Sequence, residues 1–190
     1  MAKTGERKAQ ILQTLAAMLE DPKGERITTA LLAARLEVSE AALYRHFSSK
    51  AQMFEGLIEF IEQTVFTLVN KIQAEEKDAM KQIEATVATL LGFAQKNPGM
   101  TRVLIGDALV NEDERLQARV NQLVDRLEAS LRQSARLAVT AAALPADWDV
   151  NAYANAIIAF VMGRWHQYAK SGFKRPPMEM WPQQWRVFAA

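Results

Sequence analysis

Residues 28–50 hold the side chains whose types and spacing best suit a chemical task, and that task is contact with DNA. Two short segments with helical patterning, 29–36 and 40–46, are joined by a tight turn. Thr28 and Ser39 precede the two segments, where a hydroxyl can accept a hydrogen bond from an unpaired helix N–H group. Two short capped helices joined in this way are typical of a helix-turn-helix unit, whose second helix enters the major groove.

The second segment carries the side chains expected of a helix that faces DNA. Ala41 and Ala42 are small, so the backbone could approach base edges and the methyl groups could touch thymine methyls. Polar and basic residues around them could donate hydrogen bonds to phosphate oxygens, and Lys50 also begins a helix whose free N–H groups favour an anion. The predicted DNA-binding residues are Thr28, Thr29, Ser39, Ala41, Ala42, Tyr44, Arg45, His46 and Lys50.

Both short helices need support, because helices of this length do not persist alone in water. A preceding helix at residues 6–21 supplies an apolar stripe that includes Ile11, Leu15 and Leu19. Each cap taken alone would be equally compatible with a plain three-helix bundle that does not bind DNA. The order of the parts, together with the polar and basic ending at residues 44–50, favours DNA binding over that reading.

The composition predicts an all-α chain. Of the 190 residues, 49% are hydrophobic and 24% charged, close to the globular average, and there are 8 Gly and 6 Pro. We expect two domains, a helix-turn-helix DNA-binding domain at residues 1–50 and a helical dimerisation and partner-binding domain at residues 51–190. The expected helices, about nine, lie at residues 6–21, 29–36, 40–46, 50–76, 79–96, 101–110, 112–142, 149–171 and 182–189.

Several classes of function are disfavoured by what the sequence lacks. There is no cysteine and there are two histidines, which excludes disulfides, thiolate metal sites and an all-histidine zinc site. Glycine-rich phosphate loops and nucleophile elbows are absent, so we expect no enzyme activity, cofactor or metal. A net charge of +1 argues against nonspecific coating of nucleic acid. No run of about 18 apolar residues occurs, so we expect a cytoplasmic protein without a membrane partner.

Two helices of the second domain have the patterns of a subunit interface. Residues 112–142 carry apolar residues at the near-heptad spacing typical of a coiled coil, and residues 149–171 carry a line of small residues nearly opposite their apolar stripe. A homodimer is also what a helix-turn-helix requires, because two copies together recognise a palindrome. The predicted interface residues are Leu123, Leu127, Leu131, Ala152, Ala156, Ala159 and Gly163.

Two phenylalanines lie off the apolar stripe of the helix at residues 50–76. Phe60 lies about 60° beyond the stripe edge at Leu57, and Phe66 lies off the other side. Each could touch a neighbouring helix or be left exposed for a partner, and both readings stay open. The stripe itself consists of Phe54, Leu57, Ile58, Ile61, Val65, Leu68, Val69 and Ile72.

These motifs resemble the TetR-type DNA-binding regulators and, more closely, a group within that family, the nucleoid occlusion factors. The helix-turn-helix is specific to the broad family. The sequences Leu-Ile-Glu-Phe-Ile-Glu at 57–62 and Leu-Leu-Gly-Phe-Ala at 90–94 point to the narrower group. The remaining similar segments are residues 26–30, 38–47, 53–54, 97–99 and 116–117, so the resemblance is scattered over about residues 10–135.

The resemblance implies a protein of the nucleoid that binds palindromic chromosomal sites as a homodimer, or in a higher-order assembly. It also implies binding of the tubulin-like division GTPase FtsZ, and antagonism of its polymers, through Phe60, Gly92, Lys96 and Asn97. Three positions depart from the pattern of the group. Leu68 stands where a basic residue is expected, Thr89 where an apolar one is, and Glu37 where the family usually has glycine. A positive φ at Glu37 would cost about 1 kcal/mol.

The alternative is a ligand-responsive repressor of the same family. That function needs a pocket with converging polar groups between the fourth and eighth helices. The predicted inward-facing residues are almost wholly apolar, which argues against such a pocket but leaves the alternative open.

Overall fold

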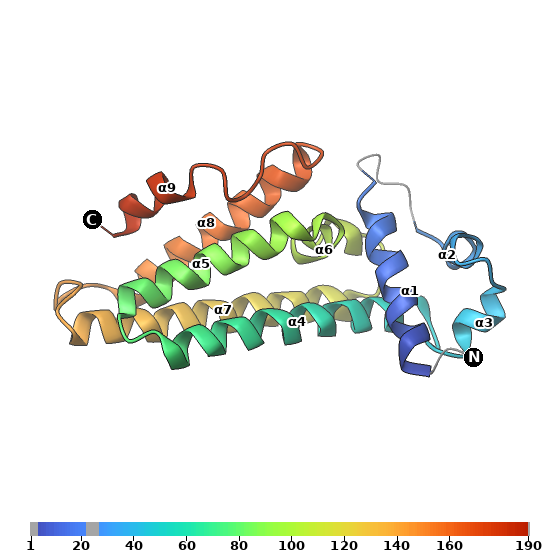
Figure 1. Ribbon diagram of the computed structural model, residues 1–190, viewed down its shortest axis with the longest axis horizontal. Helices are drawn as coiled ribbons and strands as arrows, with labels where there is room; N and C mark the ends of the chain where they lie inside the picture. The colour runs from blue at the N-terminus through green and yellow to red at the C-terminus, as the bar shows by residue number, and fades with distance from the viewer. Residues whose placement is uncertain (1–3, 22–26, 190) are drawn as a thin grey trace. The chain divides into compact units, whose positions relative to one another are not determined.

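The computed structural model describes residues 4–21 and 27–189, and all regular structure in these two ranges is helical (Figure 1). The all-α prediction is therefore confirmed. Arg26, in the similar segment at 26–30, lies outside the described ranges. The described helices are α1 (Thr4–Leu19), α2 (Thr29–Arg35), α3 (Glu40–Tyr44), α4 (Lys50–Glu75), α5 (Ala79–Lys96), α6 (Pro98–Leu104), a 3-10 helix η1 (Asp107–Leu109), α7 (Glu114–Thr140), α8 (Val150–Lys170) and α9 (Trp181–Phe188).

The chain forms two compact units that do not follow the chain order. The first takes residues 1–61 and 97–120, and the second takes residues 62–96 and 121–190. α4 and α7 each contribute their N-terminal part to the first unit and their C-terminal part to the second. The predicted functional division at residue 50 stays a prediction.

In the first unit, α1 packs against α6 as well as against α2. The apolar face of α1 is buried through Ile11 and Leu15, each 1% exposed. α6 lies very close to α1 at Gly99, where an added Cβ would lie 2.0 Å from the backbone oxygen of Ala16. Only glycine therefore lets α6 lie this close to α1.

The sixth helix differs from its predicted span of residues 101–110, which was wrong at both ends. α6 begins three residues earlier, because Pro98 occupies the first turn, where a missing N–H costs nothing. It ends at Leu104, because Gly106 takes the left-handed conformation, with φ 78°. The chain then turns through the separate η1.

In the second unit, α8 packs against α5. Trp165 of α8 is 1% exposed, and its indole Nε1 donates to the backbone oxygen of Leu90 at 3.2 Å. Tyr153 donates to the backbone oxygen of Phe188 at 2.8 Å and so satisfies a carbonyl in the last turn of α9. Burial raises the pKa of Tyr153 to about 12, so its hydroxyl keeps the proton for this bond at neutral pH.

The predicted stripe on α4 is largely confirmed, with one correction. Phe54, Ile58 and Ile61 are each at most 1% exposed, whereas Leu68 is 42% exposed. Helical periodicity places Leu68 on the same face as Ile61, about 20° away. Sharing a face with buried residues does not by itself bury Leu68, because burial requires another segment to lie against that position.

Candidate nucleic-acid interface

The first turns of α2 and α3 are capped as predicted. The Thr28 hydroxyl accepts from the backbone N–H of Leu31 at 3.1 Å, and the Ser39 hydroxyl accepts from that of Ala42 at 3.3 Å. Each hydroxyl that accepts in this way still has its own hydrogen to donate to a phosphate oxygen. The two caps therefore hold their helices and remain compatible with the predicted DNA contacts.

The turn between the two helices is strained at the position where the family usually has glycine. Glu37 has φ 55°, in the left-handed region that favours glycine. The turn is closed by a hydrogen bond from the backbone N–H of Val38 to the oxygen of Ala33, at 3.0 Å. Ala33 is 3% exposed and Leu43 of α3 is 1% exposed, so the helices meet through small and apolar side chains.

Most of the predicted DNA-binding residues in α3 and in the two positions after it lie on the surface. Ala41 and Arg45 are exposed, and Tyr44 is 45% exposed. Ala42 and His46 are half-buried. In the described part of the chain, His46 Nδ1 is buried without a hydrogen-bond partner, so a phosphate would have to meet the other ring nitrogen.

Glu40 belongs to this surface although the sequence did not predict it. Thr29 of α2 donates from its hydroxyl to Glu40 Oε2 at 2.6 Å, and the Tyr44 hydroxyl donates to Thr29 Oγ1 at 3.4 Å. This chain of hydrogen bonds ties the start of α2 to both ends of α3. The spacing in sequence gave no signal for it, because helix positions 11 residues apart are brought together only by the turn.

Lys50 is placed differently from its prediction. Its ammonium group forms an ion pair with Glu112 Oε1, and the two side chains are only 22% and 12% exposed. The ammonium also lies 5.6 Å from the centre of the Phe54 ring. Lys50 must therefore leave Glu112, or share its donors, before it can bind a phosphate.

A cavity of about 210 Å³ adjoins this ion pair within the first unit. Its polar lining includes a second ion pair, in which Arg102 Nε donates to Asp107 Oδ2 at 2.8 Å. Arg102 also donates to the backbone oxygen of Leu19 at 3.4 Å. The charged groups of the cavity are thus already paired with one another.

Replacement of Glu112 by glutamine should tighten DNA binding, because it releases the Lys50 ammonium for a phosphate. Each added phosphate contact steepens the dependence of log K on log salt by about 0.9. We expect that increase in Glu112→Gln, measured by DNA titration at several salt concentrations. Glu114→Gln, which removes an exposed charge at the start of α7, serves as the control. An unchanged slope in Glu112→Gln would show that Lys50 has only a structural role.

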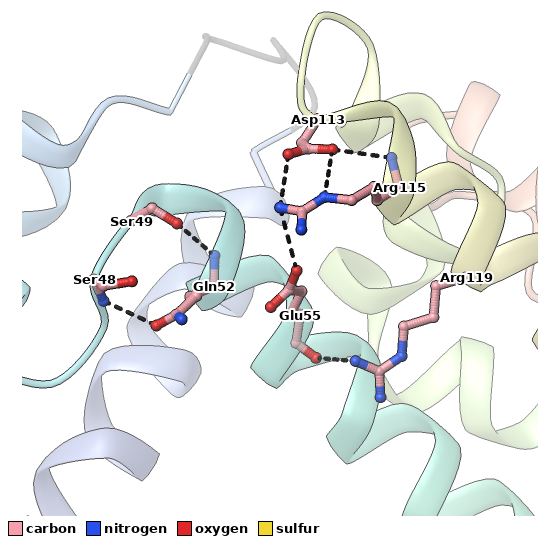
Figure 2. Close-up of polar contacts among 7 residues, drawn as sticks. All are labelled: Ser48, Ser49, Gln52, Glu55, Asp113, Arg115 and Arg119. Carbon is pink, nitrogen blue, oxygen red and sulfur yellow. Dashed lines mark hydrogen bonds and ion pairs between the residues drawn. The ribbon is translucent and has the colours of Figure 1, made fainter.

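The N-terminus of α4 is closed by its own side chains (Figure 2). Ser49 accepts from the backbone N–H of Gln52 at 3.1 Å, and the Gln52 side chain accepts from that of Ser48 at 2.9 Å. These bonds resemble a capping box. They leave fewer helix N–H groups for an anion than the sequence predicted.

α7 meets α4 one turn further along (Figure 2). Arg119 donates to the backbone oxygen of Glu55 at 3.4 Å, and Arg115 lies 3.7 Å from the Glu55 carboxylate. Arg115 also donates to Asp113, and this hydrogen bond lowers the pKa of Asp113 and raises that of Arg115. α7 begins two residues later than predicted, because Asp113 accepts from the backbone N–H of Arg115 at 3.0 Å.

Of the predicted partner-binding residues, Phe60 and Lys96 are exposed. Phe60 is 47% exposed on α4, while Gly92 and Asn97 are half-buried. The structure distinguishes the two phenylalanines: Phe60 is exposed, whereas Phe66 contacts a neighbouring helix. Phe66 is half-buried, and the guanidinium carbon of Arg126 on α7 lies 3.9 Å from its ring centre.

The predicted dimer residues divide by helix. On α8, Ala152, Ala156, Ala159 and Gly163 are exposed. On α7, Leu123, Leu127 and Leu131 are each at most 1% exposed inside the chain's own core. Near-heptad spacing describes any long apolar stripe, including one that the same chain covers, and here the chain covers these leucines itself.

In the described ranges, no three His, Asp or Glu side chains are grouped so as to hold a metal ion. Among the described helices, none has the length and apolar character needed to cross a lipid bilayer.

Comparison with known proteins assigns families to most of the chain. Residues 23–57 match the family described as "Bacterial regulatory proteins, tetR family", and residues 77–190 match the SlmA-like family "Tetracyclin repressor-like, C-terminal domain". The nucleoid occlusion factor SlmA of Marinomonas sp. strain MWYL1 is 52% identical, over 98% of this chain and 95% of its own. That of Alteromonas mediterranea is 52% identical, over 96% and 93%.

A solved structure supports the fold. The TetR family transcriptional regulator PfmR from Thermus thermophilus superposes with a TM-score of 0.79, over 94% of this chain and 96% of its own. Its sequence is 20% identical, so this similarity supports only the assignment of the fold.

Proposed function

The chain belongs to the TetR family of bacterial regulatory proteins, in its SlmA-like group, and from that premise we propose that it is a nucleoid occlusion factor. In this role it binds palindromic chromosomal sites as a dimer and antagonises FtsZ assembly over the nucleoid. The observation that carries the proposal is the 52% identity to nucleoid occlusion factors along nearly the whole of both chains.

The surface of α3 supports the DNA-binding part of the proposal. The caps at Thr28 and Ser39 hold two short helices in the arrangement in which the second enters a major groove. Ala41 leaves room for base edges, and Tyr44 and Arg45 are exposed beside it. We assign this role to residues 1–50 and assign dimerisation and partner binding to residues 51–190.

The exposed small residues of α8 support a dimer. Ala152, Ala156, Ala159 and Gly163 would let a second copy approach closely enough for backbone-to-backbone packing. A dimer also suits the proposed DNA sites, because helix-turn-helix dimers bind two half-sites about one turn of DNA apart.

Phe60 supports the FtsZ-binding part of the proposal. A single aromatic side chain exposed on a helix is the kind of residue that anchors a protein interface. We place Lys96, Gly92 and Asn97 in the same function because the group resemblance assigns them to it.

The test is sedimentation of FtsZ polymers in the presence of GTP, this protein and DNA with a site selected by the protein. We expect less FtsZ in the pellet when the protein and its DNA are both present. Unchanged sedimentation would contradict the proposal. Mapping of bound sites on the chromosome separates it from the ligand-responsive repressor, since dispersed sites support occlusion and a single promoter supports the repressor.

A further inference from the structure

We propose that Glu40 determines base specificity by accepting a hydrogen bond from cytosine N4 in each half-site. This inference rests on the proposed binding of α3 to DNA. It concerns a residue outside the predicted DNA-binding set, distinguished by its hydrogen bond to Thr29.

Glu40 is the hydrogen-bonding side chain best placed at the start of α3. The N-terminal residues of a recognition helix are those that contact base edges. In the first turn of α3, Glu40 and Ala41 are exposed, and alanine has no group with which to hydrogen-bond a base. The hydroxyl of Ser39, just before the helix, accepts from the N–H of Ala42, and we assign its remaining hydrogen to a phosphate oxygen.

The Glu40 side chain is held in place before DNA arrives. The hydroxyl of Thr29 donates to Oε2 at 2.6 Å, and Thr29 in turn accepts from Tyr44 at 3.4 Å. A carboxylate has a second oxygen with which to accept from a base. Because the Glu40 rotamer is already fixed, the side chain loses less conformational entropy when DNA binds. A site with the wrong base at this position leaves the carboxylate without a donor, which lowers the affinity.

The chemistry of an ionised carboxylate restricts which base it can contact. It only accepts hydrogen bonds, and the donors in the major groove are cytosine N4 and adenine N6. In adenine the acceptor N7 lies beside the N6 donor, and N7 repels the second carboxylate oxygen. In cytosine the position beside the N4 donor is a C–H group, which does not repel it. Guanine and thymine present acceptors. Since phosphates also repel the carboxylate, Glu40 lowers affinity for any site that lacks the matching donor.

The experiment selects sites from a randomised DNA library with the full-length protein and its variants. For the wild type we expect cytosine at one position in each half-site. In Glu40→Ala the preference at that position should fall by about 5- to 150-fold, the range expected for one base contact. In Glu40→Gln it should move toward adenine, because an amide can pair with both N6 and N7.

Glu37→Gln is the matched control. It removes the same charge from an exposed residue of the same unit, on the turn before α3, so it should raise nonspecific affinity without changing the base profile. Thr29→Val removes the hydrogen bond that holds Glu40 and should weaken the cytosine preference in part.

An unchanged base profile in both Glu40 variants would overturn the inference and leave the proposed function standing. A wild-type protein that selects no sequence at all would overturn the proposed DNA binding, and this inference with it. Equal melting temperatures of the Glu40 variants and the wild type exclude misfolding as the cause of a lost preference.

Discussion

Phe60→Ala should abolish the antagonism of FtsZ polymers while leaving DNA binding intact. Phe60 is 47% exposed on α4, so a large part of its surface is free to contact a partner. Loss of an aromatic anchor at the centre of an interface costs about 2 kcal/mol or more. The affinity for FtsZ should therefore fall by about 30-fold or more. The readout is FtsZ sedimentation with saturating site DNA, together with a DNA titration of the same variant.

Phe66→Ala is the matched control for this prediction. The two phenylalanines lie on the same helix, but Arg126 covers the ring of Phe66 at 3.9 Å. Phe66→Ala should therefore lower thermal stability and keep the effect on FtsZ. If Phe60→Ala still antagonises FtsZ at wild-type concentrations, the partner binds elsewhere on the protein.

Gly99→Ala should strongly destabilise the first unit, although it adds only one methyl group. The new Cβ would lie 2.0 Å from the backbone oxygen of Ala16 and 3.1 Å from the Leu19 Cβ. Because the nearest atom is backbone, α1 or α6 must move, and overpacking of this kind costs about 1–3 kcal/mol or more. For a chain of this length that corresponds to a fall in Tm of roughly 2–12 °C, measured by thermal unfolding.

Gly92→Ala makes the same chemical change as Gly99→Ala, but it should raise the stability of the protein. Gly92 lies inside α5, where an added Cβ meets nothing within 4 Å. Alanine in place of glycine in a helix interior stabilises by about 0.5–1 kcal/mol, so the melting temperature should rise. A Gly99→Ala variant as stable as the wild type would mean that α1 and α6 are not packed as described.

Gly99 also marks a limit of what the sequence can predict. As a local conformation, the run from Asn97 to Gly99 predicts only a break between two helices. The structure places Pro98 and Gly99 inside α6 and assigns Gly99 to the contact with α1. A tight backbone approach between segments far apart in the chain leaves no local pattern, so the sequence cannot distinguish it from a turn.

The ion pair of Lys50 illustrates the same limit at the DNA interface. The sequence correctly places Lys50 at the start of a helix that follows the helix-turn-helix. Its partner, Glu112, lies 62 residues away, and nothing in the spacing of the two residues links them. In the structure, the Glu112 carboxylate already holds the Lys50 ammonium, so a DNA phosphate would have to compete with it.

The sequence alone determined the features that depend on neighbours within a few residues. The hydroxyl caps at Thr28 and Ser39 and the all-helical character were predictable, because capping and helix periodicity act over one or two turns. The left-handed φ at Glu37 was suggested only by the glycine that the family usually has there. Only the tertiary structure decided which faces are covered. Periodicity assigned Leu68 to the core and Leu127 to a subunit interface, yet the fold exposes the first and buries the second, because burial depends on which distant helix lies against each face.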